Sequence, residues 1–189
     1  MLGRRTTTRR APLATGSLLA LAGCLTDAGN GDAPGPSLSS PAFTAGTSIP
    51  TRYTCDGADV SPPLVLAGTP DVESLAVVVE DPDAPGDEPF VHWLLWNVPP
   101  DTEAIPEGIE PEPTVEALDG AVQGTNDFGD LGYGGPCPPA DDDPHAYEFT
   151  VLLLDTTLDL DPGADVAGFR DAVDAHVTDD ATLTGTYQR

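Results

Sequence analysis

The hydrophobic positions of the chain fall into short runs, and most of these runs have the character of buried strands. Residues 74–80 (SLAVVVE), 92–98 (HWLLWNV) and 147–155 (YEFTVLLLD) are rich in Val, Leu and aromatic residues and are bounded by clusters of Pro, Gly and Asp. Such runs predict buried β-strands. Shorter apolar segments at residues 64–66 and 185–187 predict two weaker strands.

A single segment, residues 165–177, has helical periodicity. Its apolar residues recur at spacings of three, four and four: Val166, Phe169, Val173 and Val177. Asp165 suits the N-cap or the first turn, and His176 would lie in the last turn, where a cation favours the carbonyl end. The whole pattern predicts a mainly β protein, a sandwich of antiparallel sheets with one late helix and long Pro- and Gly-rich loops.

The first 24 residues have the layout of a twin-arginine-type lipoprotein signal peptide. Arg9-Arg10 precede an uncharged stretch, residues 11–23, which is shorter than the roughly 20 residues that span a bilayer. The sequence Leu-Ala-Gly-Cys at residues 21–24 resembles a lipobox, in which Cys24 is acylated and becomes the mature N-terminus. An ordinary cleavage site with an incidental Cys is the alternative.

Residues 25–40 consist mostly of Gly, Asp, Pro and Ser and predict a flexible tether. The folded domain is then expected over residues 41–189. A tether behind an acylated Cys24 predicts an extracytoplasmic protein that a lipid anchors to the cell membrane.

The charge of the chain is strongly one-sided. All 7 basic residues are Arg, four of them lie within the first ten positions, and there are 32 acidic residues, so residues 25–189 carry 3 − 32 = −29. This charge excludes nucleic acid as a partner. A Lys-free, Asp-rich surface is expected of a halophilic host, where salt screens the self-repulsion.

The candidate chemistry lies at the ends of predicted strands. His92 begins one strand, His145 precedes another, and Asp81 and Asp83 follow a third. Loops at strand ends tend to build sites, although the pattern alone leaves a chance placement open, and Asp81 before Pro82 also suits a plain turn. The histidines lack the spacing of a metal site, and no Ser has a nucleophile-elbow pattern, so we expect no metal and no cofactor.

Five motifs resemble, in order, those of the phosphatidylethanolamine-binding protein family, specifically its prokaryotic Raf-kinase-inhibitor-like branch. They are YTCDGADVSPPL (53–64), VVVEDPDAP (77–85), HWLLWNVP (92–99), GTNDFGDLGYGGPCPP (124–139) and HAYEFTVLLLD (145–155). The resemblance runs from about Pro41 to Arg189 and implies a sandwich-like antiparallel β fold with a C-terminal α-helix and a small pocket for phosphate-type anions. By motif, the pocket would take Asp81, Asp83, His92, Gly135, Pro136, His145 and Tyr147.

In such a pocket, protonated His92 and His145 would donate charge-assisted hydrogen bonds to an anion, and Asp81 would raise their pKa. Gly135 would let backbone N–H groups approach the ligand. The chain departs from the family pattern at Ala146, where an Arg is usual, and at Leu66, where a Trp is common. Losing the Arg removes a bidentate phosphate donor or a structural ion pair.

The cysteine count predicts a disulfide, and the resemblance implies a function. With Cys24 acylated, Cys55 and Cys137 are an even pair in an oxidising compartment and are expected to form a disulfide; two buried free thiols are the alternative. The expected function is non-enzymatic binding of a small anionic or phosphorylated ligand. The alternatives are an inhibitor or regulator of a protease or another protein partner, and an unrecognised hydrolase.

Overall fold

The computed structural model of the protein describes Gly3 and residues 35–69 and 72–189. Apart from Gly3, the predicted signal peptide with Cys24 lies outside the described residues, as do residues 25–34 of the predicted tether. Within the described part, no helix is long and apolar enough to cross a membrane.

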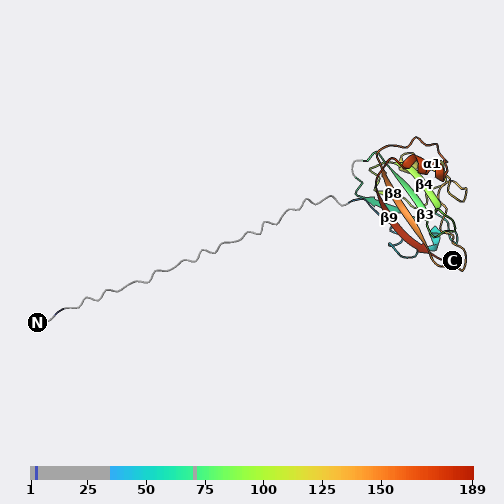
Figure 1. The fold of residues 1–189 in the computed structure, drawn as a ribbon, viewed down its shortest axis with the longest axis horizontal. Coiled ribbons are helices and arrows are strands. Elements are labelled where there is room, and N and C mark those ends of the chain that lie inside the picture. Colours follow the sequence, from blue (N-terminus) through green and yellow to red (C-terminus); the bar gives the residue numbers. More distant parts are fainter. Residues whose placement is uncertain (1–2, 4–34, 70–71) are drawn as a thin grey trace. The chain divides into compact units, whose positions relative to one another are not determined.

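A six-stranded antiparallel sheet forms the larger layer (Figure 1), in the order β6-β7-β4-β3-β8-β9. Its strands are β3 (Ser74–Asp81), β4 (Phe90–Val98), β6 (Thr114–Val115), β7 (Ala121–Gln123), β8 (His145–Leu154) and β9 (Val177–Tyr187). The three strands predicted from strong apolar runs are thus confirmed as β3, β4 and β8. The weak prediction at residues 185–187 covers only the end of β9, which pairs with β8 along its whole length.

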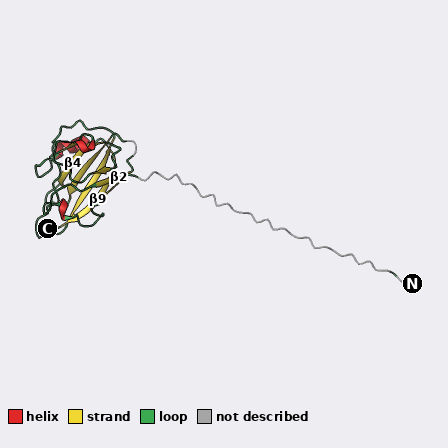
Figure 2. Ribbon diagram, turned by 180° about the vertical axis from the view of Figure 1, so that it is seen from behind, coloured by secondary structure: helices red, strands yellow, loops and turns green. Residues whose placement is uncertain are grey.

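A second, three-stranded sheet has the order β1-β2-β5, with β1 (Ser37–Ser39), β2 (Leu64–Ala67) and β5 (Ala104–Ile105). Figure 2 shows β2 from behind. The prediction of a flexible tether up to Ser40 is wrong at its end, because Ser37–Ser39 forms a strand. Leu38 pairs with Leu66 and is only 8% exposed, so burying this one side chain orders the segment.

The two sheets enclose the main core, which confirms the predicted sandwich. Side chains from the small sheet, such as Leu64 and Ile105, pack in one cluster with Val77, Trp93 and Phe149 of the large sheet. The opposite face of the large sheet packs against the helix in a second cluster, which includes Leu94, Trp96 and Phe169. Two short 3-10 helices, η1 (Thr51–Tyr53) and η2 (Glu116–Leu118), lie in the connections.

The single α-helix, α1 (Val166–Val173), begins where the sequence predicts. The Asp165 side chain accepts a hydrogen bond from Gly168 N at 2.9 Å, which is an N-cap. The helix ends four residues earlier than predicted because Val177 pairs with Leu154 and begins β9.

The predicted place of His176 in the last helical turn is therefore wrong. His176 lies between α1 and β9, and its Nδ1 is 2.8 Å from Asp155 Oδ1. The ring thus interacts with a carboxylate and does not cap the helix.

Candidate functional site

Three of the predicted site residues line one pocket of about 200 Å³: Asp81, His92 and His145. Their exposed fractions are 3%, 2% and 5%. The other walls are mostly apolar and include Pro85, Phe90, Phe128, Cys137, Pro138 and Pro139. A small concave site with a few convergent polar groups among apolar walls is the usual form of a ligand pocket.

A larger hollow of about 580 Å³ lies beside α1, but none of the predicted site residues lines it. Its charged residues are Glu88, Asp127, Asp165, Arg170 and Asp171. None of them is buried, and Arg170 is already paired with Glu80 and Glu88. The smaller pocket is the better candidate because its ionisable groups are buried, and burial is what sets unusual protonation states.

Sheet topology brings Asp81 and His145 together. Asp81 is the last residue of β3, and His145 is the first residue of the antiparallel neighbour β8. The register pairs Glu80 with Glu148, so the end of one strand and the start of the next lie at the same edge. The proximity predicted from strand ends therefore follows directly from antiparallel pairing.

His92 reaches the pocket through an irregularity in β4. Val79 pairs with Trp93 and Glu80 pairs with Val91, so β4 contains one extra residue, His92, between these pairs. This two-against-one arrangement is a β-bulge, which redirects side chains locally.

The bulge decides which way the imidazole points. Regular alternation would place His92 on the face of Leu94 and Trp96, whose side chains pack toward α1. The His92 ring instead lies 5.2 Å from the ring of Tyr147, which belongs to the cluster between the sheets. The histidine thus shares a pocket with Asp81 and His145.

Asp81 and His145 form a buried ion pair. Asp81 Oδ2 lies 2.8 Å from His145 Nδ1, and Asp81 Oδ1 accepts a hydrogen bond from Asp83 N at 2.9 Å. Burial lowers the pKa of His145, but the hydrogen bond and charge of Asp81, assisted by Asp142, outweigh it and raise the pKa above its usual value. The predicted direction is confirmed for His145.

For His92 the predicted direction is wrong. Burial among aromatic rings lowers the pKa of His92 and outweighs the hydrogen bond to Gly134 and the charge of Asp81. His92 Nδ1 lies 2.7 Å from Gly134 O. Because a carbonyl oxygen only accepts, Nδ1 carries the hydrogen, and the neutral ring leaves Nε2 as an acceptor. Among the described residues, the hydrogen bond of the His92 ring is the one that Nδ1 makes to Gly134 O.

Tyr147 packs near the rings of both histidines. Its ring lies 5.2 Å from that of His92 and 6.5 Å from that of His145. The hydroxyl group is buried and makes no hydrogen bond to any described residue. Burial, together with the charge of Asp81, raises the pKa of Tyr147 well above its usual value. The hydroxyl therefore stays protonated, and Tyr147, although predicted as a ligand-binding residue, is not among the residues that line the pocket.

The other predicted site residues have structural roles. Gly135 N donates to Asp59 Oδ1 at 2.7 Å, so this N–H group is not free to meet an anion as predicted. A Cβ at Gly135 would lie 2.5 Å from that same oxygen, which explains the glycine. Asp83 Oδ2 accepts from Ala146 N at 2.8 Å, and Pro136 O accepts from Cys55 N at 3.2 Å.

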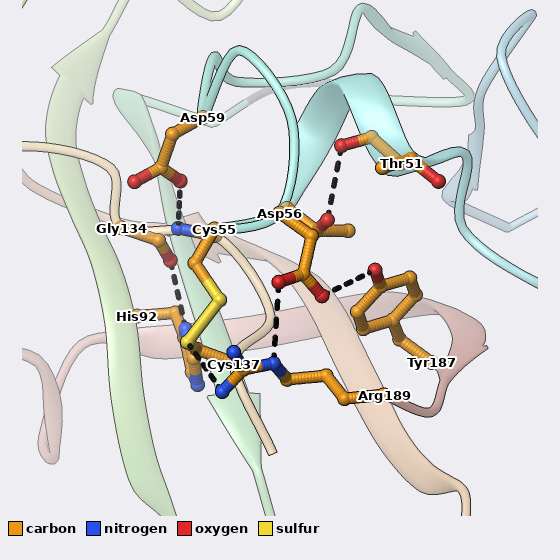
Figure 3. The surroundings of a disulfide bond; sticks show 11 residues. Thr51, Cys55, Asp56, Asp59, His92, Gly134, Cys137, Tyr187 and Arg189 are labelled. Atoms are coloured by element: carbon orange, nitrogen blue, oxygen red, sulfur yellow. Dashed lines mark hydrogen bonds and ion pairs between the residues drawn. A yellow bond between two sulfur atoms is a disulfide. The ribbon is translucent and has the colours of Figure 1, made fainter. Parts of the chain in front are cut away.

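The predicted disulfide between Cys55 and Cys137 is present, with Cα atoms 5.5 Å apart (Figure 3). Beside it, Asp56 accepts a hydrogen bond from Tyr187 Oη at 2.8 Å and pairs with Arg189 at 3.2 Å. Cys137 lines the pocket. The bond thus joins two of the sequence motifs directly at the pocket wall.

The aromatic walls were missed by sequence reasoning. Phe90 and Phe128 pack edge-on with centroids 4.7 Å apart. The buried Asn126 holds the Phe128 loop, because Asn126 Oδ1 accepts from Phe128 N at 3.0 Å and Nδ2 donates to Gly132 O at 2.9 Å. The Asn-Asp-Phe motif was a usable signal, since Asn before a turn commonly binds its own backbone.

Comparisons with known proteins agree with one another. A family model described as "Phosphatidylethanolamine-binding protein" matches residues 39–188. The chain is 49% identical over 142 residues to a UPF0098 protein of Pyrococcus horikoshii, covering 75% of this chain and 71% of that one.

Two solved structures are similar to this chain in fold and sequence. Escherichia coli YbcL, described as a new member of the mammalian PEBP family, has a TM-score of 0.77 and 32% identity over 82% of this chain and 99% of its own. CT736 from Chlamydia trachomatis, described as a homolog of phosphatidylethanolamine-binding protein, has a TM-score of 0.73 and 36% identity over 82% of this chain and 98% of its own.

Proposed function

Because the chain belongs to the phosphatidylethanolamine-binding protein family, we propose that its folded domain binds a small anionic or phosphorylated ligand without catalysing a reaction. The ligand would occupy the pocket of Asp81, His92 and His145. The observation that carries this proposal is the pairing of the two buried histidines through Nδ1, with Asp81 for His145 and with Gly134 O for His92, which leaves the Nε2 atom of each ring for a ligand.

A phosphate monoanion matches the hydrogen-bond donor and acceptor that the two histidines offer to the pocket. Protonated His145 uses Nδ1 on Asp81 and keeps its Nε2–H for an anionic oxygen, with a charge-assisted hydrogen bond. Neutral His92 offers Nε2 as an acceptor for the remaining P–OH hydrogen. A monoanion that both donates and accepts therefore satisfies groups that are otherwise unpaired.

The apolar walls favour an organic substituent on the phosphate. Phe128 is 47% exposed although it is large and apolar, and it lines the pocket with Phe90 and Pro138. Covering such a ring removes apolar surface from water and is favourable by about 25 cal/mol per Å². Phenyl phosphate is thus a suitable probe, since it combines both features.

Calorimetric titration with phenyl phosphate in molar salt tests the proposal. We expect binding that strengthens as the pH falls through the raised pKa of His145, and a loss of most affinity in His145→Ala and His92→Ala. His176→Ala is the matched control, because this ring is half-exposed and pairs with Asp155 away from the pocket. Equal affinity in all three variants would reject this pocket as the site.

The same titration separates binding from hydrolysis. Phenyl phosphate releases phenol when it is cleaved, so an absorbance record taken during the experiment reports turnover. We expect no phenol, because no Ser, Thr or free thiol is among the residues lining this pocket, and its one carboxylate, Asp81, is held by His145 and by Asp83 N. Phenol release that depends on His145 would support a hydrolase and contradict a purely binding role.

We further propose that Cys24 anchors the domain to the outer side of the cell membrane through a lipid. The lipobox-like residues 21–24 support this, and the Cys55–Cys137 disulfide is typical of an oxidising compartment. Replacing Cys24 with Ser should release the protein into the medium. Membrane retention of that variant, measured beside the unaltered protein, would contradict a lipid anchor.

A further inference from the structure

One carboxylate outside the predicted site faces the free donor of His145. Asp142 Oδ2 lies 3.7 Å from His145 Nε2, which is too long for a hydrogen bond but close enough for a strong charge interaction. The His145 side chain is 6% exposed, whereas that of Asp142 is 53% exposed. The acid therefore approaches the buried ring from the solvent side.

The backbone of Asp142 is held in place, but its carboxylate is not. Gln188 Nε2 donates to Asp142 O at 2.9 Å, and Asp142 N donates to Pro139 O at 3.3 Å. Within the described part of the chain, the carboxylate accepts only a long bond from Asp143 N, at 3.3 Å. A half-exposed side chain with such weak contacts can change rotamer at little cost.

The other charged or titratable groups near His145 do not have this freedom. Asp81 is 3% exposed and accepts two hydrogen bonds. Asp83 is engaged by Ala146 N, and His92 is neutral and bound to Gly134 O. Tyr147 stays protonated because its pKa is raised. Among the described residues near His145, only Asp142 combines proximity to Nε2 with a half-exposed, weakly bonded carboxylate.

We propose that Asp142 is an electrostatic gate, whose carboxylate competes with an anionic ligand for the free N–H of His145. This inference rests on the proposed function. In the empty pocket Asp142 neutralises the exposed side of the imidazolium, and a ligand displaces it toward solvent. Because a second negative charge near Asp142 is unfavourable, the gate also selects for ligands with one negative charge over those with two.

Asp142→Asn tests the gate, with Asp143→Asn as the matched control, since it removes the same charge one residue away. Each protein is titrated with inorganic phosphate in molar salt while the histidine ring resonances are followed by NMR. At a separation near 4 Å and a screening length of about 3 Å in molar salt, removing the charge should tighten phosphate binding roughly 1.5-fold or more. We expect the gain in Asp142→Asn and no comparable gain in Asp143→Asn.

The same spectra provide a readout that a purely structural residue would not change. Asp142 contributes to the raised pKa of His145, so this pKa should fall in Asp142→Asn and stay unchanged in Asp143→Asn. If phosphate shifts the His92 and His145 resonances equally in all three proteins, with equal affinity, the gate is wrong and the binding proposal stands. If phosphate shifts neither resonance in any of them, phosphate binding itself fails and the gate fails with it.

Discussion

Tyr147→Phe should stabilise the protein and leave its response to ligand unchanged. The Tyr147 hydroxyl is buried and unpartnered among the described residues, whereas the ring packs against both histidines. An unsatisfied buried polar group costs about 1–3 kcal/mol, and the substitution removes only that group. Taking the lower bound, a gain of about 1 kcal/mol raises the melting temperature by roughly 2–4 °C in a domain of this size.

Tyr187→Phe is the matched control, because it removes the same atom where the atom has a partner. Tyr187 Oη donates to the Asp56 carboxylate at 2.8 Å, and a hydrogen bond to a charged group contributes about 1.5–3 kcal/mol. Its melting temperature should therefore fall, while that of Tyr147→Phe rises.

Melts of both variants, with and without phenyl phosphate, measure the two effects together. Phenyl phosphate should raise the melting temperature of Tyr147→Phe as much as that of the unaltered protein, because the buried hydroxyl is not part of the pocket lining. If Tyr147→Phe melts lower, as Tyr187→Phe is expected to do, its hydroxyl has a partner in solution and the reasoning is refuted.

Three further predictions concern salt, the disulfide and pH. The −29 charge of residues 25–189 should lower the melting temperature when salt falls from about 1 M to 0.1 M and the screening length grows from about 3 to 10 Å; an unchanged midpoint would contradict this. Replacing Cys55 and Cys137 with Ser opens a loop with a separation of 82 residues and should cost about 4 kcal/mol in denaturant unfolding, while two titratable thiols in the unaltered oxidised protein would exclude the bond. Because the pKa of His145 is raised on folding, its contribution to stability is complete below the usual histidine pKa of about 6.5 and is lost as pH rises through the raised value; His145→Gln should remove this dependence, and a variant that retains it would assign the effect to another group.

The sequence by itself determined the main strands, the start of the helix and the residues that meet at the site. These features depend on local information. An apolar run such as residues 74–80 is stable only when it is buried, and the Asp165 side chain caps the helix that follows it. The sequence motifs also predicted Asp81, His92 and His145 as site residues, and all three line one pocket.

Some elements depend on partners that are distant in the chain. The first half of β9 is polar and largely exposed, and it is a strand because β8 supplies its hydrogen bonds. Likewise β1 depends on β2, against which Leu38 packs. Polar or very short segments carry little hydrophobic pattern of their own, so no local reading of them predicts a strand.

The chemistry of the pocket was decided by tertiary structure. The sequence placed Asp81 near both histidines and predicted a raised pKa for both, but the folded chain pairs Asp81 with His145 and encloses His92 in aromatic rings. The bulge that turns His92 toward the pocket arises from the pairing of β3 with β4. The sequence states which groups are present, but a pKa depends on the distances and the burial of those groups, and only the packed sheets determine these quantities.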